Sequence, residues 1–327
     1  MYPIKFKPLL KERIWGGSFL CEKEVEEYHL RDGIGESWEI SGIENSISKV
    51  ENGKLKGNTL TELLEVYMGD LVGEKTYLKY GNFFPLLLKI IDTSDLLSVQ
   101  VHPNDELAKE RHDSYGKNEL WYIIDCHDEA YIYLGFKIGT TQEQYLEALK
   151  RKDVESILNK VPVKKGESYY IPAGAVHALG AGILIAEVQQ PSDITYRIFD
   201  WNRVDKDGKG RELHTELALE AINFKYIFSG SIDVKHKNNE SVIIHKSENF
   251  TTAIIELNGS MDVDLIERDS FTAYLCVDGV AFITSEDTAV TLDYGEVVFI
   301  PNELDNITIS GKGKILEFYI ETPEEVC

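Results

Sequence analysis

The chain has 327 residues, of which 43% are hydrophobic and 28% are charged, and its formal net charge is −22 at pH 7. This length allows one large or two medium hydrophobic cores. The acidic balance argues against binding to nucleic acid or to an anionic membrane surface, because both require a basic protein face.

Targeting signals and cysteine pairs are not apparent in the sequence. No segment is apolar over the roughly 20 residues that a membrane-spanning helix needs, and residues 1–5 lack the apolar run of a secretory signal. We therefore expect a cytoplasmic protein. Cys21, Cys126, Cys276 and Cys327 are scattered without a Cys-x-x-Cys pair, which favours reduced thiols over a zinc ribbon or a disulfide framework.

The first third of the chain predicts strands, one helix and a buried strand. Residues 3–50 alternate apolar and polar side chains, as strands and loops do. Residues 59–69 begin with a capping box and continue with helical apolar spacing, which predicts a short amphipathic helix. Phe84–Ile91 is apolar on both faces of an extended chain and predicts a buried strand, interrupted by Lys89. Lys89 either reaches solvent at the strand edge or points into a polar cavity.

Candidate metal ligands follow this strand. Gln100 and His102 are two positions apart on an extended segment, so their side chains point to the same side. Glu119 begins another apolar strand, and residues 166–177 predict a strand, a tight turn and a second strand that points His177 inward. His102, Glu119 and His177, with Gln100 as a candidate fourth ligand, leave room for water or substrate. Such an open nitrogen and oxygen set is typical of a catalytic metal site.

The second half of the chain predicts two more helical segments and an internal repeat. Residues 141–161 have helical spacing and should form an insertion between two strands of one barrel, and residues 212–224 predict a further helix. Gly295–Pro301 repeats the Gly-x5-Pro spacing of Gly166–Pro172. This internal similarity indicates two β-barrels.

The second copy lacks the residues of the candidate metal site. Counted from Pro301, Glu303 and Asn306 stand at the positions of the glycine and the histidine of the first copy, and Phe271 is expected at the position of Glu119. We therefore expect the second barrel to serve as scaffold or interface.

These patterns resemble known families. Gly166-x5-Pro172-x-Gly174-x2-His177 is similar to the second cupin motif, although Ala181 replaces its usual asparagine, and Gln100-x-His102 followed by Glu119 is similar to a variant of the first. Longer segments resemble type I mannose-6-phosphate isomerase in its short bacterial form, over about residues 3–225. These segments are Arg13–Gly17, Gly35–Glu39, Phe84–Lys89, Ser98–Asp105 and Thr195–Asp200.

The resemblance implies an all-β dominated fold of two cupin-type β-barrels (jelly rolls), with a few helices inserted in and flanking the first. A catalytic cupin domain would cover residues 1–225 and contain the helical insertions at about 59–69, 141–161 and 212–224. A degenerate cupin-like barrel would cover residues 226–327.

The resemblance also implies a metal-dependent isomerase that interconverts mannose 6-phosphate and fructose 6-phosphate through an enediolate, with one Zn²⁺ per chain. The same donor set suits Fe²⁺ or Mn²⁺. Arg197 matches the family's active-site arginine, and an ion pair with a carboxylate is its alternative role. Ser98, Lys89 and Lys117 are expected to contact the sugar phosphate. The base that moves the proton between C1 and C2 stays open among Lys117, Glu119 and a metal-bound hydroxide.

Other functions are alternatives at this stage: another sugar-phosphate isomerase of the cupin superfamily, an Fe(II) cupin dioxygenase, or a non-catalytic sugar-binding cupin. The last usually accompanies a DNA-binding domain, and the sequence shows none. An anionic substrate requires a local basic cluster in this acidic chain, which is feasible because charges beyond roughly 8 Å are largely screened. The sequence predicts no oligomeric state.

Overall fold

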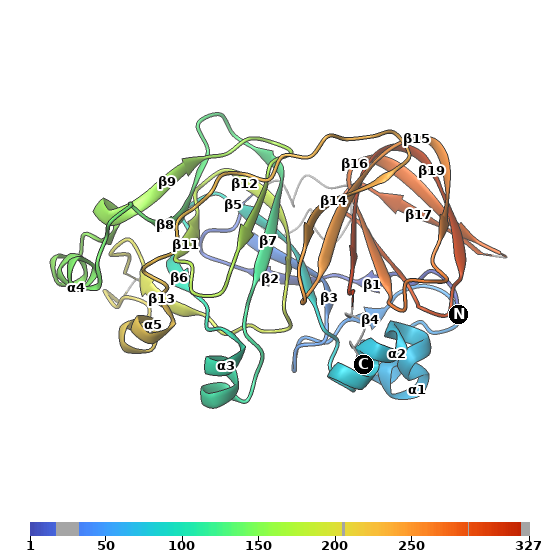
Figure 1. Cartoon of the computed structure of the whole chain (residues 1–327), viewed down its shortest axis with the longest axis horizontal. Helices are drawn as coiled ribbons and strands as arrows, with labels where there is room; N and C mark the ends of the chain where they lie inside the picture. Colours follow the sequence, from blue (N-terminus) through green and yellow to red (C-terminus); the bar gives the residue numbers. More distant parts are fainter. Residues whose placement is uncertain (18–32, 205–206, 287, 322–327) are drawn as a thin grey trace. The chain divides into compact units, whose positions relative to one another are not determined.

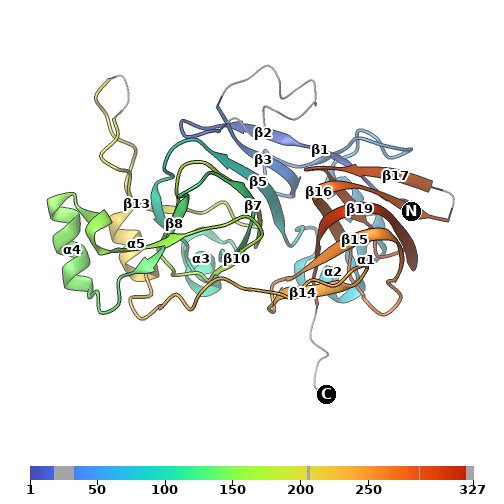
Figure 2. The same cartoon turned by 90° about the horizontal axis from the view of Figure 1, so that it is seen from above.

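The computed structural model describes residues 1–17, 33–204, 207–286 and 288–321. Antiparallel β-sheets dominate these residues, and helices connect some of the strands (Figures 1 and 2). This confirms the predicted fold class. Residue contacts divide the chain into two compact units. We call Leu10–Ser37 with Ile90–Ser231 the site unit, and Met1–Leu9 with Trp38–Lys89 and Ile232–Cys327 the C-terminal unit.

Two sheets build the site unit, although β2, β3 and β5 also have residues in the other unit. The first sheet runs in the order β10 (Ser168–Ile171), β7 (Glu119–Cys126), β12 (Ile183–Gln189), β5 (Leu87–Thr93), β3 (Ile34–Ser41) and β2 (Leu9–Glu12). The second runs in the order β13 (Tyr196–Phe199), β6 (Val99–Val101), β11 (His177–Leu179), β8 (Tyr131–Phe136) and β9 (Leu158–Pro162).

The core of the site unit lies between side chains of both sheets. Trp121 and Ile123 of β7 belong to one buried cluster with Ile132 and Leu134 of β8. Since side chains alternate along a strand, the other face of the second sheet carries a separate apolar cluster. Helices α4 (Gln142–Arg151) and α5 (Thr215–Ala221) contribute to that second cluster and lie beside this sheet in Figures 1 and 2.

The helical predictions for the site unit are confirmed in part. Residues 141–161 contain α4, which starts at a capping box on Thr141, and a 3-10 turn at Val154–Ile157. The end of this prediction is wrong, because Leu158–Pro162 pairs with β8 as strand β9. Residues 212–224 contain α5 over a shorter span. A further helix, α3 (Asp105–His112), is capped by Asn104, as its position after Pro103 suggests.

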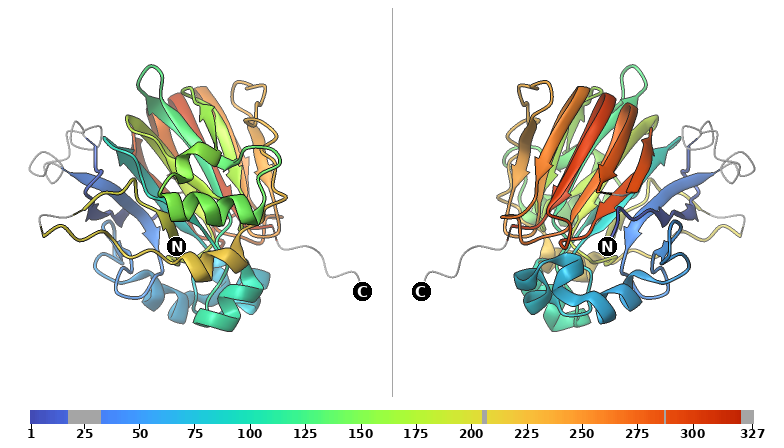
Figure 3. Two further views of the ribbon diagram at one scale, coloured as in Figure 1. Left: turned by 90° about the vertical axis from the view of Figure 1, so that its left-hand side faces the viewer. Right: turned by 90° about the vertical axis from the view of Figure 1, so that its right-hand side faces the viewer.

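The C-terminal unit is a sheet of long antiparallel strands, seen side by side in orange and red in Figure 3. Its order is β14 (Ser241–Lys246), β15 (Thr251–Asp264), β19 (Asn306–Tyr319), β16 (Thr272–Ser285) and β17 (Thr288–Asp293), and β18 (Val297–Ile300) also pairs with β16. A short pair, β1 (Phe6–Lys7) and β4 (Lys49–Val50), belongs to the same unit.

Helices α1 (Leu60–Val72) and α2 (Glu74–Tyr80) also belong to the C-terminal unit. The predicted capping box at Thr59 is present, but the helix continues beyond Gly69 after an interruption at Met68, where φ is 47° and ψ is −121°. Two backbone carbonyls of α1 that follow this interruption accept hydrogen bonds from the backbone nitrogens of Asn302 and Glu303. These long-range bonds explain why the helix segment packs with residues near the end of the chain.

The two contact units are therefore not separated by a single boundary at residue 225, which is the boundary expected from the sequence. Met1–Leu9 and Trp38–Lys89 join the C-terminal residues, since Ile4 forms a bridge with Phe299 and the Phe84 ring lies 4.9 Å from that of Phe271. Contacts between segments so distant in sequence leave no local pattern that could predict them.

Strand register corrects one detail of the internal repeat. Glu119 pairs with Ile171, the residue before Pro172. In the second copy Thr272, not Phe271, pairs with Ile300, the residue before Pro301. Thr272 is therefore the structural counterpart of Glu119, and the expectation for Phe271 was wrong by one position, which moves a side chain to the opposite face of a strand.

Cys126 and Cys276 are free, whereas Cys21 and Cys327 lie outside the described residues. Within the described parts of the chain, no helix is both long and apolar enough to cross a membrane.

Candidate metal centre

Strand pairing aligns several of the predicted site residues. His177 on β11 pairs with Gln100 on β6, and Gln100 pairs with Arg197 on β13. Residues paired across neighbouring strands have their side chains on the same face of the sheet. His102 lies two positions after Gln100 and shares that face by alternation. One face of the second sheet therefore carries both histidines, the glutamine and the arginine, whereas Glu119 comes from the first sheet.

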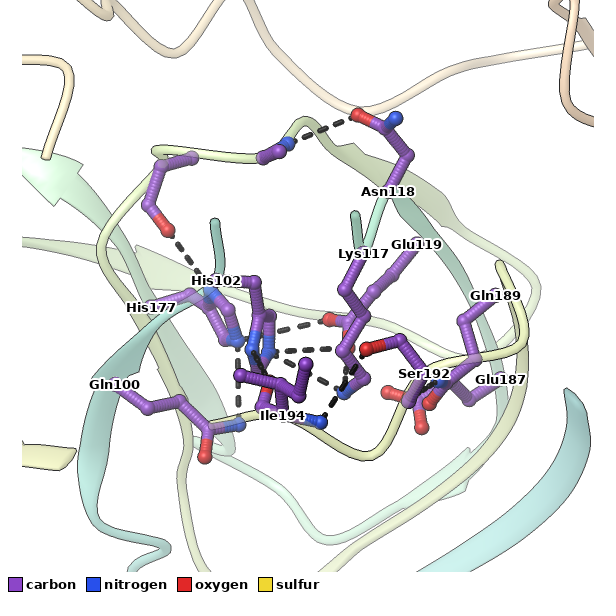
Figure 4. Close-up of polar contacts among 12 residues, drawn as sticks. Gln100, His102, Lys117, Asn118, Glu119, His177, Glu187, Gln189, Ser192 and Ile194 are labelled. Atoms are coloured by element: carbon purple, nitrogen blue, oxygen red, sulfur yellow. Dashed lines mark hydrogen bonds and ion pairs between the residues drawn. The ribbon is translucent and has the colours of Figure 1, made fainter. Parts of the chain in front are cut away.

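His102, Glu119 and His177 converge on one buried point, as Figure 4 shows. The Nε2 atom of His102 lies 3.2 Å from Oε1 of Glu119, and Nε2 of His177 lies 3.6 Å from Oε2. Candidate ligand atoms of the three residues all lie within 4.8 Å of one another, and each residue is at most 1% exposed. This confirms that the three predicted ligands meet.

Backbone carbonyls fix the orientation of both imidazole rings. Nδ1 of His102 lies 2.9 Å from the carbonyl oxygen of Ile194, and Nδ1 of His177 lies 2.9 Å from that of Ala175. A carbonyl can only accept a hydrogen bond, so the proton of each neutral ring resides on Nδ1. The unprotonated Nε2 atoms then face Glu119, which is the arrangement that histidine ligands of metals commonly show.

The turn before His177 depends on a glycine. Gly174 has φ of +86°, a conformation that residues with a side chain rarely adopt. A Cβ atom at this position would lie 2.9 Å from the carbonyl oxygen of Ala221. Its backbone nitrogen donates to the carbonyl of His102, 2.9 Å away, which ties the turn to the strand that bears the other histidine.

The charges of the cluster favour an unprotonated ligand set. Burial, with a smaller contribution from the nearby Lys117 ammonium, lowers the pKa of His102 to about 3. Burial also lowers the pKa of His177. For Glu119, burial favours the neutral acid, but the Lys117 ammonium opposes burial and the pKa is held well below its usual range. The site therefore consists of two neutral imidazoles and a carboxylate anion.

The residues present fit a metal ion. Both Nε2 atoms and both oxygens of Glu119 are acceptors, and acceptors this close together need a shared positive charge. Oε2 of Glu119 is buried and has no hydrogen-bond donor among the described residues. A divalent cation bound between these atoms would satisfy it, and imidazole with carboxylate suits zinc as well as iron.

Gln100 and Lys117 lie at the edge of the cluster. The carboxamide nitrogen of Gln100 is 3.2 Å from Nε2 of His177. The nitrogen and oxygen of a carboxamide exchange places by a simple flip, so Oε1 can be turned towards the cluster. Lys117 is 4% exposed, and its ammonium binds Glu119 and lies 3.3 Å from Nε2 of His102. Lys117 thus lies against the ligands themselves.

Arg197 meets Ser98, another predicted site residue. Its Nε donates to Oγ of Ser98, 3.1 Å away, and its Nη1 donates to the carbonyl oxygen of Glu212, 3.0 Å away. Burial lowers the pKa of Arg197, and the neighbouring Arg211 lowers it further. Arg211, which was not predicted as a site residue from the sequence, therefore lies near Arg197 and also binds Asp200.

Lys89 is buried in β5, where its ammonium lies 5.3 Å from the centroid of the Trp38 ring. Its role in substrate binding stays a prediction. Glu187, a buried carboxylate on β12 that was not predicted as a site residue, accepts a hydrogen bond from Nε1 of Trp121 at 2.8 Å. The signal that could have identified it is a charged residue inside the otherwise apolar run Ile183–Val188.

Family models and curated relatives match most of this chain. The phosphomannose isomerase type I catalytic domain matches residues 4–130, and the mannose-6-phosphate isomerase cupin domain matches residues 239–320. The chain is 36% identical to the mannose-6-phosphate isomerase ManA of Bacillus subtilis over 321 residues, which cover 94% of this chain and 96% of that protein.

Solved structures show the same fold. A crystal structure of the mannose 6-phosphate isomerase from Bacillus subtilis has a TM-score of 0.87 and 32% identity, and it covers 98% of this chain and 100% of that one. A putative mannosephosphate isomerase from Archaeoglobus fulgidus has a TM-score of 0.81 at 23% identity, with 98% and 99% coverage. With a full-length relative above 30% identity and both domains matched, this chain belongs to the type I phosphomannose isomerase family.

Proposed function

We propose that this protein is a zinc-dependent mannose-6-phosphate isomerase that interconverts mannose 6-phosphate and fructose 6-phosphate. The observation that carries the proposal is the buried convergence of His102, Glu119 and His177 in a member of the type I phosphomannose isomerase family. Three protein ligands with room for a further one are typical of a catalytic zinc site. In this proposal the metal ligands and Arg197 lie in the site unit, and the barrel predicted for residues 226–327 contributes no chemistry.

His102, Glu119 and His177 would hold the ion, and Gln100 is the candidate for a fourth ligand. When bound, the ion supplies Lewis acidity, which polarises the sugar carbonyl and stabilises the negative charge of the enediolate. The carbonyl oxygens of Ile194 and Ala175 keep the two imidazoles in the required tautomer.

Lys117 is the group that we propose for moving the proton between C1 and C2 of the sugar. Glu119 is the less suitable base, because its carboxylate binds the Lys117 ammonium and faces both imidazoles as a proposed metal ligand. A group that moves this proton would have to lie beside the residues that hold the ion, because C1 and C2 carry the oxygens that the ion would polarise. The contacts of Lys117 with Glu119 and His102 support this role.

Arg197 is proposed to act on a negatively charged oxygen of the substrate. Arginine stays protonated and presents a planar fork to oxyanions. Ser98 and the carbonyl of Glu212 restrain its guanidinium. Ser98 and Lys89 complete the proposed contacts with the sugar phosphate.

A coupled assay tests this function. Mannose 6-phosphate and glucose 6-phosphate are compared as substrates before and after removal of metal with a chelator, and after reloading with Zn²⁺, Fe²⁺ or Mn²⁺. We expect turnover of mannose 6-phosphate, loss of turnover on chelation and best recovery with Zn²⁺. Full turnover of the metal-free protein, or absence of turnover by every metal-loaded form, would refute the proposal.

A further inference from the structure

The carboxamide of Asn118 joins the chain segments that carry the predicted metal ligands. Oδ1 of Asn118 accepts hydrogen bonds from the backbone nitrogen of Ala173 at 2.9 Å and from the hydroxyl of Tyr170 at 3.2 Å. Nδ2 of Asn118 donates to Oε1 of Gln190 at 2.6 Å. Figure 4 shows the Asn118 side chain pointing away from the histidines, towards the loop that leads to His177. Asn118 therefore contacts no ligand atom but holds the chain around them.

Gln190 extends this connection to a third segment. Its Oε1 also accepts from the backbone nitrogen of Asn118 at 3.0 Å, and its Nε2 donates to Oδ1 of Asp105 at 2.9 Å. The same oxygen of Asp105 accepts from the backbone nitrogen of Gly116 at 2.8 Å. Gln190 is 3% exposed, so water cannot easily replace these bonds.

The linked positions are neighbours of all three predicted ligands. Asp105 is three residues after His102, Asn118 immediately precedes Glu119, and Ala173 lies in the turn that leads to His177. A change in any of these bonds would shift a backbone segment that carries a ligand. Metal coordination tolerates distance changes of only about 0.2 Å, so such shifts weaken metal binding.

We propose that Asn118 is a positioning residue of the metal centre, whose carboxamide holds the turn before His177 against the start of β7 and, through Gln190, against Asp105. This inference rests on the metal binding in the proposed function. Outer partners of metal ligands typically affect metal affinity by about 10–100-fold. A residue that only stabilises the fold would lower the melting temperature without this specific loss.

The test compares Asn118→Ala with Asn52→Ala. Asn52, in the C-terminal unit, bridges two backbone groups in a similar way, accepting from the nitrogen of Lys5 at 2.9 Å and donating to the carbonyl of Pro3 at 3.0 Å. Zinc affinity is measured by competition with a chromophoric chelator, and the melting temperature is measured on metal-free protein. We expect zinc affinity to fall about 10–100-fold in Asn118→Ala and to change less than about twofold in Asn52→Ala.

A second variant keeps the inference testable if Asn118→Ala does not fold. Asn118→Asp retains the acceptor for Ala173 and Tyr170 but loses the donor to Gln190, so its zinc affinity should fall by less than that of Asn118→Ala. If the folded variants bind zinc as wild type does, Asn118 has no positioning role. If the wild-type protein itself binds no zinc, the metal in the proposed function is refuted, and the inference is refuted with it.

Discussion

The surroundings of His102 and His177 keep both imidazoles neutral, with Nε2 unprotonated. Each Nδ1 is held by a backbone carbonyl, and burial disfavours the charged ring, so both Nε2 atoms face Glu119 unprotonated. Removal of either histidine would deprive a bound ion of one ligand. The carboxylate of Glu119 would stay buried, with no hydrogen-bond donor to Oε2 among the described residues.

His177→Ala should abolish stable metal binding. We expect metal content per chain, measured by elemental analysis, to fall far below wild type, and turnover to fall by more than about 100-fold, since even outer partners account for about 10–100-fold in affinity. Added zinc should raise the melting temperature of the wild type but not of the variant. His236→Ala is the matched control, because His236 is exposed and lies in the other unit. Full metal occupancy in His177→Ala would place the site elsewhere.

Arg197→Lys should lower kcat while KM changes little. Lysine keeps the positive charge but lacks the fork that Ser98 and the Glu212 carbonyl now restrain. If Arg197 stabilises charge that develops in the transition state, kcat should fall on the order of 100-fold. A raised KM with unchanged kcat would show instead that Arg197 binds the phosphate equally in ground and transition states. Unchanged values of both constants would reduce it to a structural partner of Ser98.

The sheets of the two units contain equivalent polar pairs. Glu187 pairs with Trp121 across β12 and β7, and Glu317 pairs with Tyr274 across β19 and β16. In each unit the aromatic side chain donates to the glutamate, at 2.8 Å from Trp121 and at 3.0 Å from Tyr274. Glu317 of the C-terminal unit is thus a buried carboxylate at the position equivalent to Glu187 of the site unit.

In the C-terminal unit, the guanidinium of Arg268 binds the carboxylate of Glu317. Nη1 of Arg268 donates to Oε1 of Glu317 at 2.6 Å and to Oγ1 of Thr272 at 2.9 Å. Thr272 is the counterpart of Glu119, so a fixed cation of the protein contacts the position where the first copy offers a metal ligand. The C-terminal unit therefore needs no metal to compensate its buried charge.

Arg268→Ala should destabilise the protein without affecting the metal. Removal of one partner of a buried ion pair costs about 3–5 kcal/mol, because the other charge remains buried. The free energy of unfolding from denaturant titration should fall by about this amount, whereas metal content of folded protein should stay at the wild-type level.

Two further variants complete this test. Arg268→Ala combined with Glu317→Gln should recover part of the lost stability, because the uncompensated charge is gone. Asn306→Ala, at the exposed counterpart of His177, should leave both stability and turnover near wild type. Loss of metal in either folded Arg268→Ala or Asn306→Ala would contradict the separation of roles between the units.

The whole molecule is strongly acidic, with a formal net charge of −22, whereas the proposed substrate is an anion. At about 0.01 M ionic strength the Debye length is roughly 30 Å, so the global charge repels the substrate; at about 0.15 M it is roughly 8 Å. We expect kcat/KM to rise with NaCl over this range, and KCl should give the same curve. A fall in kcat/KM would indicate that the cluster around Arg197 and Arg211 dominates the approach of the substrate.

The sequence by itself determined the fold class, the residues that meet in the candidate metal centre and the starts of two helices. These features are local: alternation along a strand puts Gln100 and His102 on one face, Thr59 and Thr141 begin helices through capping boxes, and the glycine turn leads to His177. The motifs also carried the resemblance to the family that the comparisons established.

Only the tertiary structure decided which distant residues meet. The grouping of α1 with Asn302 and Glu303, the bond between Ser98 and Arg197, and the burial of Glu187 depend on contacts between residues far apart in the chain. Such contacts follow from packing and from strand register. A shift of one residue turns a side chain to the opposite face, and spacing alone therefore could not distinguish Phe271 from Thr272.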